Sequence, residues 1–127
     1  MLDSISRYIR PLGALNAFIA VTAGAFAAHG LKNTLSANDL NTFKTAADYQ
    51  MVHGLGLILI GIMDRIHSKH INIISAIIMF IGILIFSGSL YLLTLTDTRW
   101  LGMITPVGGT CFLIAWLMLA VSHISNS

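Results

Sequence analysis

Charged residues are scarce in this 127-residue chain. Only 9% of the residues are Asp, Glu, Lys or Arg, whereas a soluble domain carries about 25%. The formal net charge is only +2, and contacts with nucleic-acid phosphates need clustered Lys and Arg. The composition therefore argues against a soluble domain and predicts no nucleic-acid partner.

Cysteine and proline are also rare. The one cysteine, Cys111, lies in an apolar run. It has no partner for an intrachain disulfide, and a lone cysteine gives no zinc-binding pattern. The chain has two prolines and no linker rich in Pro, Gly or Ser, so the sequence predicts a single domain, residues 1–127.

Apolar residues, by contrast, are abundant. They make up 56% of the chain, and the mean hydropathy is +0.83. A membrane-spanning helix needs about 20 mostly apolar residues. Four segments qualify, at about residues 11–28, 47–63, 71–95 and 101–122. We therefore predict an all-α integral membrane protein, a bundle of four transmembrane helices in the plasma (inner) membrane.

The first span has an alternative interpretation. Arg7 and Arg10 precede it, and "AFA" at residues 25–27 resembles a signal-peptidase site. A cleaved signal peptide would show the same features. The apolar run is longer than that of a typical signal, and three more spans follow, which favours a retained helix.

The segment between the first two spans carries a helical pattern of its own. Ser36 and Asp39 have the spacing of a helix-capping pair. Leu40, Phe43 and Ala47 then fall on one helical face. This pattern predicts a short amphipathic helix at the membrane surface, running into or hinged onto the second span. A partly ordered polar loop is the alternative.

Lys and Arg near the span ends indicate the orientation. Four spans place both termini on one side of the membrane. The basic residues of that side are Arg7, Arg10, Arg65 and Lys69, and those of the other are Lys32, Lys44 and Arg99. Four against three favours cytoplasmic termini.

Polar residues gather in one half of the membrane. Because successive spans alternate in direction, the end of the first, the start of the second, the end of the third and the start of the fourth share one face. The polar and backbone-active residues at these places are His29, Tyr49, Gln50, His53, Ser87, Ser89, Tyr91, Thr105, Pro106, Gly108 and Gly109. Polar side chains avoid lipid and turn inward, so we predict one polar cluster that binds a ligand. In the opposite half only Asn16 and Asn72 interrupt the apolar sequence, and residues 67–70 are expected to form a solvated turn.

Small residues at helical spacing indicate close helix packing. They are Gly13, Ala17, Ala20, Gly24 and Ala28 in the first span, Gly54 and Gly61 in the second, and Gly82 in the third. Pro106 removes one amide from the helix ladder, so the fourth span is expected to start with a loosened turn. Gly30 is a candidate left-handed cap for a first helix that ends at His29.

Four ordered motifs resemble a known family. "AGAFAAHGL", "YQMVH", "FSGSLY" and "ITPVGG" followed by "FLIAW" are similar to the domain of unknown function 423 family, related to transmembrane protein 256. The resemblance covers essentially the whole chain. It implies a four-helix membrane fold and no particular reaction. Its motifs include every residue of the predicted polar cluster, together with Gly88. Members often have a basic C-terminal tail, which implies a cytoplasmic C-terminus, but "SHISNS" has only His123.

These observations support several hypotheses about function. The first is a non-enzymatic protein whose polar cluster, with His53 at its centre, binds a small molecule, a lipid headgroup, a proton or a partner. A chain this small would then form a homo-oligomer through the small residues of the first span. The second is a metal, haem or redox protein with His29 and His53 as ligands, although no cofactor is predicted from the motifs. The third is a structural small subunit of a larger membrane complex.

Two further interpretations concern single side chains. Catalysis by Ser87 or Ser89 with His53 lacks an acid to orient the imidazole. Tyr91, Trp100 and Trp116 are expected to anchor the bundle at the membrane interfaces.

Overall fold

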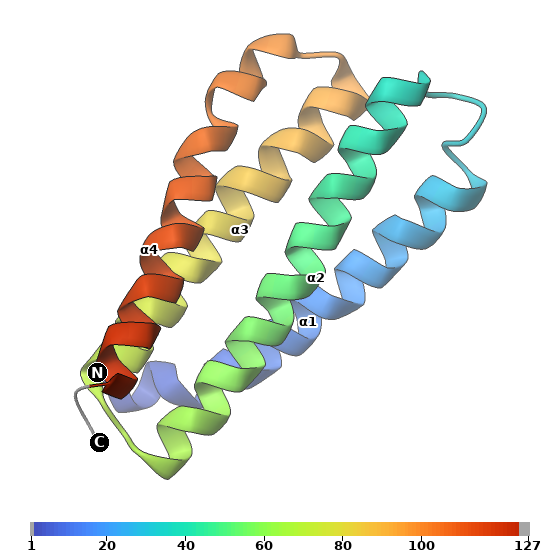
Figure 1. Cartoon of the computed structure of the whole chain (residues 1–127). Helices are drawn as coiled ribbons and strands as arrows, with labels where there is room; N and C mark the ends of the chain where they lie inside the picture. The colour runs from blue at the N-terminus through green and yellow to red at the C-terminus, as the bar shows by residue number, and fades with distance from the viewer. Residues whose placement is uncertain (1, 125–127) are drawn as a thin grey trace.

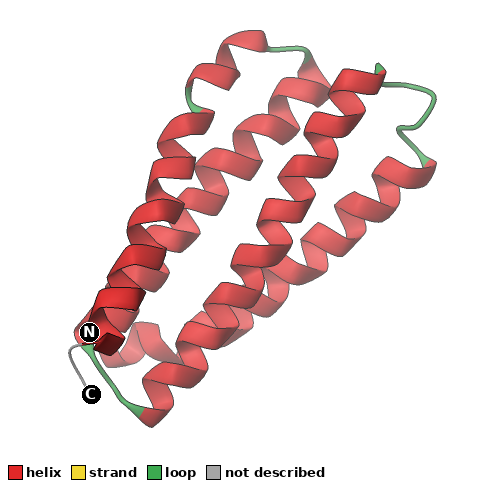
Figure 2. Ribbon diagram, in the orientation of Figure 1, coloured by secondary structure: helices red, strands yellow, loops and turns green. Residues whose placement is uncertain are grey.

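Four long helices make up nearly the whole molecule. The computed structural model describes residues 2–124, so Met1 and residues 125–127 of the predicted domain lie outside the described residues. The elements are α1 (Leu2–His29), α2 (Ala37–Ile66), α3 (His70–Thr96), the short 3-10 helix η1 (Arg99–Met103) and α4 (Thr105–Ile124). Each of the four long helices is long and apolar enough to cross a membrane, which confirms the predicted fold. Short loops join them (Figure 2).

The helices pack in chain order. Within residues 2–124, close backbone packing joins α1 to α2, α2 to α3 and α3 to α4, and α1 also touches α3. Alternating directions bring the end of α1, the start of α2, the end of α3 and the start of α4 to one end of the bundle (Figure 1). We call this the loop end. The described chain begins and ends at the opposite, terminal end.

Ser36 begins α2 as the sequence predicts. Its backbone is extended and its side chain accepts a hydrogen bond from the Asp39 amide at 3.1 Å. The predicted amphipathic segment then continues into the second span without a break. Its buried face consists of Phe43, Ala46 and Ala47, so packing against the bundle holds these first turns in place.

The end of α1 differs from the prediction. Gly30 is not a left-handed cap, because no glycine among the described residues has a positive φ. Instead the amides of Gly30 and Leu31 both donate to the Phe26 carbonyl, at 2.7 and 3.0 Å. Leu31 is then buried beside Ala27 and Phe43. This apolar contact fixes the turn where a left-handed glycine was expected.

The start of the fourth span consists of two helical segments. A 3-10 helix, η1, precedes α4, and Pro106 is the second residue of α4. At that position a proline costs no internal hydrogen bond, because the first helical amides have no partner within the helix. The loosened turn therefore lies just before Pro106.

Close approaches of backbones occur where the small residues meet. A side-chain carbon added to Gly13 would lie 2.5 Å from the Gly54 carbonyl oxygen, and one added to Gly54 would lie 3.1 Å from the Ala17 amide nitrogen. Ala20 is also buried, whereas Gly24 meets nothing within 4 Å and Ala28 is exposed. The part of this stripe around Gly13 is therefore occupied by α2 and is not free to contact a second copy.

The apolar core lies mainly between α2, α3 and α4. Gly82 of α3 faces the Phe112 ring, and Gly61 of α2 faces the Arg10 side chain of α1. The core is formed by Ile9, Leu57, Ile60, Ile73, Ala76, Met79, Ile83, Phe112, Ala115 and Leu119. It holds α2 and α3 at the centre, with α1 and α4 as outer helices.

Candidate functional site

Three polar side chains form a hydrogen-bonded chain across three helices near the loop end. The Gln50 amide nitrogen donates to Asn16 Oδ1 at 3.1 Å, and the Tyr91 hydroxyl donates to Gln50 Oε1 at 2.8 Å. Asn16 in turn donates to the Leu12 carbonyl at 2.9 Å. Gln50 and Asn16 are buried, so these hydrogen bonds join α1, α2 and α3 inside the bundle. We call Asn16, Gln50 and Tyr91 the polar relay.

The two serines of α3 also hold helices together. Ser87 donates to the Ala46 carbonyl of α2 at 2.7 Å, and Ser89 Oγ lies 2.5 Å from Thr105 Oγ1 at the start of α4. Neither serine makes a hydrogen bond to His53 among the described residues. The arrangement lacks the base contact that a serine nucleophile needs.

His53 faces α4 rather than this relay. The Trp116 indole N–H donates to His53 Nε2 at 3.0 Å, and His53 Nδ1 lies 2.7 Å from the Tyr49 carbonyl oxygen. An indole N–H is only a donor and a carbonyl only an acceptor. His53 therefore carries its proton on Nδ1 and is neutral, because a second proton on Nε2 would break the bond to Trp116.

Aromatic rings surround this histidine. The His53 and Phe112 rings stack with their centroids 3.5 Å apart and their planes 10° apart. Tyr49 stacks beside both rings and contacts Phe86 of α3, with centroids 4.5 Å apart. The rings come from α2, α3 and α4. The stack therefore connects α2 to α4, although the backbones of these two helices are not in close contact among the described residues.

A groove of about 560 Å³ lies along these rings. We call it the aromatic groove. It is lined by Tyr49, Val52, His53, Phe86, Pro106, Gly109, Thr110, Phe112, Leu113 and Trp116. Its volume falls within the range of about 300–1,000 Å³ that is typical of small-molecule sites. Its exposed apolar wall, formed by Val52 and Leu113, would face lipid, so the groove opens sideways into the membrane.

The predicted polar cluster thus separates into several places. Gln50, Ser87 and Tyr91 line a smaller hollow between α1 and α3, and Ser89 and Thr105 pair with each other. Tyr49, His53, Pro106 and Gly109 line the aromatic groove. Gly108 is packed against the Phe86 backbone, whereas a side-chain carbon added to Gly109 would make an ordinary contact with the Phe86 ring, at 3.9 Å.

The structure does not bring His29 and His53 together in one site. His29 is exposed at the end of α1, a helix without close backbone packing on α4 in the described chain. His53 faces α4 and has both ring nitrogens bonded. Within residues 2–124, no group of three or more His, Cys, Asp or Glu side chains could hold a metal ion. The two histidines do not fit a shared haem or metal.

Several residues of these sites are absent from the predicted cluster. The sequence assigns Asn16 to the opposite half of the membrane, but in the structure it bonds to Gln50. The sequence predicts Trp116 to be an interface anchor, and Phe112 is one residue in an apolar run. A tryptophan inside one apolar span, together with an intramembrane histidine in another, is the signal that could have found Trp116, since buried indole N–H groups seek acceptors.

A second polar cluster lies at the terminal end. Asp64 is buried and accepts hydrogen bonds from the Ser6 hydroxyl at 2.8 Å and the Lys69 amide at 3.2 Å. Asn72 is buried as well and donates to Asp64 Oδ1 and to the His67 carbonyl. The tract of residues 67–70, expected as a solvated turn, is thus held by a buried carboxylate. This cluster fixes the α2–α3 connection.

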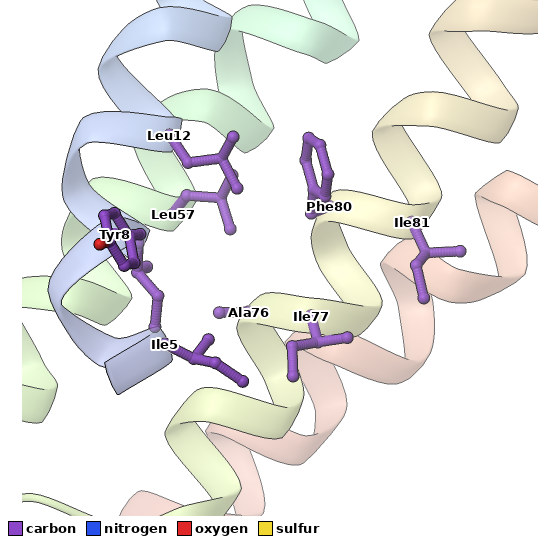
Figure 3. Close-up of a pocket in the computed structure, with 9 residues that line it drawn as sticks. Ile5, Tyr8, Leu12, Leu57, Ala76, Ile77, Phe80 and Ile81 are labelled. Carbon is purple, nitrogen blue, oxygen red and sulfur yellow. The ribbon is translucent and has the colours of Figure 1, made fainter. Parts of the chain in front are cut away.

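Another hollow, of about 190 Å³, is wholly apolar. It lies between α1, α2 and α3, where Tyr8, Leu12, Leu57 and Phe80 surround it (Figure 3). No polar atom lines it. It can accommodate hydrocarbon, but it offers no group for chemistry.

An ion pair closes the loop end. Asp39 lies in the polar first turn of α2, ahead of the apolar stretch that crosses the membrane. The Arg99 guanidinium of η1 donates to both of its carboxylate oxygens, at 2.8 and 2.7 Å. These hydrogen bonds lower the pKa of the Asp39 carboxyl from its usual value. The pair links the start of α2 to the segment that precedes α4.

The fold and its sites define a class: a four-span membrane protein with a polar interior near one end and a ring-lined groove that opens sideways. Residues 23–109 match the family model described as "Protein of unknown function (DUF423)", and the chain belongs to this family.

Similar proteins are named as membrane proteins. The chain is 53% identical over 110 residues to a UPF0382 membrane protein of Staphylococcus saprophyticus, covering 87% of this chain and 91% of the relative. It is 41% identical over 114 residues to the UPF0382 membrane protein YwdK of Bacillus subtilis, covering 89% and 93%. No solved structure matches the chain. The chain is therefore a membrane protein of a family without an assigned activity.

Proposed function

We propose that this protein is a non-enzymatic membrane protein that holds a small, membrane-dissolved molecule in the aromatic groove between α2 and α4. The observation that supports it best is the groove itself. It has the volume of a small-molecule site, an apolar mouth and a histidine–tryptophan pair inside. Apolar pockets with few, well-placed polar groups are the usual form of ligand sites.

The lining indicates the class of ligand. Four aromatic side chains besides His53 offer ring faces and edges, which suit a flat, mostly apolar molecule. The Tyr49 hydroxyl has no hydrogen-bond partner among the described residues, so it is free to bond to a ligand oxygen. The ligand is then a largely apolar molecule with one polar end, and it enters from the lipid rather than from water.

The site is built for binding more than for reaction. His53 is the one imidazole in the groove lining, and both of its nitrogens are engaged. The groove presents no carboxylate and no thiol in its lining. His53 would act on a bound molecule only after its hydrogen bond from Trp116 was replaced by one from the ligand.

In this proposal the termini are cytoplasmic. The loop end, and with it the groove, then lies toward the outer leaflet of the plasma membrane.

Native mass spectrometry tests this function on protein released gently from its own membrane. The wild type is expected to retain a reproducible extra mass. Gly109→Leu fills the groove and should lose that mass, since Gly109 lines the groove and a side-chain carbon there meets no atom closer than the Phe86 ring at 3.9 Å. Gly24→Leu is the matched control, because Gly24 meets nothing within 4 Å and lies on α1; it should retain the mass. A bare wild-type protein, or a mass kept by Gly109→Leu, contradicts the proposal.

A structural role in a larger membrane complex is the second candidate. The hydrogen bonds between Asn16, Gln50 and Tyr91 favour it, because each of them joins parts of this chain. In that case the polar residues only hold the helices together. For this candidate, the protein should carry no small molecule but should co-purify with the same partner proteins in fixed proportions. Gly109→Leu should leave those proportions unchanged.

A further inference from the structure

A basic hollow lies at the terminal end, away from the aromatic groove. It has a volume of about 180 Å³ and is lined by Asp3, Ser6, Arg7, Arg10 and Arg65. We propose that it binds the phosphate group of an anionic phospholipid. The side chains come from the first turns of α1 and the last turn of α2, so two helices supply one site.

The three guanidinium groups of this hollow are unpaired. Both ion pairs found within residues 2–124 belong to Arg99, at the other end of the bundle. Asp3 is the only acid of the lining, so three positive charges face one negative charge. Asp64, the residue before Arg65, does not line the hollow but accepts a hydrogen bond from its Ser6 hydroxyl at 2.8 Å. Counting the Asp64 carboxylate together with that of Asp3 still leaves three positive charges against two negative ones. The hollow therefore has an uncompensated positive charge that an anion would neutralise.

Contacts within the fold hold two of the three arginines, Arg10 and Arg7. The side-chain stem of Arg10 lies over Gly61 of α2, where any side chain would displace it. Arg7 lies over the Tyr8 ring, with its guanidinium carbon 5.6 Å from the ring centroid. A guanidinium donates to two phosphate oxygens at once, which suits it to phosphate recognition. Prior placement of the arginines reduces the entropy that binding would cost.

The depth of the hollow identifies the source of the phosphate. Arg10 stands directly before Pro11, where the apolar run of α1 begins, and Arg65 follows closely after Met63, where that of α2 ends. Both therefore lie at the boundary between hydrocarbon and headgroups. Basic pockets between transmembrane helices at this depth bind lipid headgroups. A phospholipid of the surrounding leaflet is always present there, whereas free phosphate must arrive from water.

Native mass spectrometry of the full chain in detergent, titrated with dioleoyl phosphatidylglycerol or dioleoyl phosphatidylcholine, tests this site. We expect the wild type to prefer phosphatidylglycerol. Arg7→Gln with Arg65→Gln removes two exposed charges from the hollow and should weaken phosphatidylglycerol binding about 30-fold, whereas phosphatidylcholine binding should not change. The matched control is Lys32→Gln with Lys44→Gln, which removes two exposed charges at the loop end and should leave both affinities unchanged.

Three results would overturn the proposal. One is equal binding of the two lipids by the wild type. Another is the same loss of phosphatidylglycerol binding in both double variants, which would indicate a general charge effect. The third is binding of inorganic phosphate that the arginine variant loses, without a preference for phosphatidylglycerol; this would assign the hollow to a free anion. Thermal unfolding in the same detergent verifies that both double variants are folded.

Discussion

The two sides of α2 differ in how they meet their neighbours. On the side of α1, the backbones approach so closely that a side-chain carbon on Gly13 would lie 2.5 Å from the Gly54 carbonyl oxygen. On the side of α4, side chains alone bridge the helices, and a groove of about 560 Å³ remains. Around Gly13 and Gly54, the first side leaves no room for another molecule. The second leaves room because rings, rather than glycines, set the separation of the helices.

The largest expected effect lies on the close-packed side. Gly13→Val should destabilise the protein by about 3 kcal/mol, because its side chain must force α1 away from α2. Unfolding in a detergent titration measures this loss. Gly24→Val serves as the control, since Gly24 meets nothing within 4 Å, and it should change the stability little. Equal losses in both variants would show that α1 and α2 do not depend on this contact.

An intermediate effect is expected at the polar relay. Gln50→Leu removes the hydrogen bonds to Asn16 and Tyr91, and should cost about 1.2 kcal/mol, since such bonds in membrane bundles average about 0.6 kcal/mol each. The same titration measures the loss. A double-mutant cycle with Tyr91→Phe should return a coupling of about 0.6 kcal/mol. Strict additivity of the two substitutions would contradict the relay.

The smallest effect on stability is expected across the groove. Trp116→Phe keeps a ring but removes the donor to His53 Nε2, at a cost of about 0.6 kcal/mol. Nitrogen NMR of labelled histidine gives a sharper readout. Both the wild type and the variant should show His53 protonated on Nδ1, because the Tyr49 carbonyl accepts there in both proteins. The signal of Nε2 should shift in the variant, which has lost its hydrogen-bond donor. Protonation on Nε2 in the wild type would contradict the geometry.

The sequence predicted the four spanning helices, but not which neighbour each polar side chain faces. Hydropathy and the alternation of span direction were sufficient for the four helices and the loop end. Gln50 and His53, three residues apart, nevertheless turn to different helices: Gln50 to α1 and α3, and His53 to α4. The rotation of each helix depends on side-chain packing between helices, which a single sequence does not report.

Asp64 shows the same limit at the terminal end. In the sequence it belongs to a polar turn that is typical of a solvated connection. In the structure it is buried, because Ser6 and Asn72 reach it from α1 and α3. Its burial depends on how three distant segments meet. A local pattern identifies the capping of α2 by Ser36, because both partners lie within one turn, but it does not identify this contact.

The central claim is that the groove between α2 and α4 holds a membrane-dissolved molecule. Photo-crosslinking in intact membranes tests it most directly. A photoreactive amino acid at Leu113, in the groove lining, is compared with one at Leu117, which is exposed on the same helix outside that lining. Mass spectrometry of the labelled peptides should find a distinct small adduct at Leu113 and only common lipids at Leu117. The same set of adducts at both positions would contradict the claim.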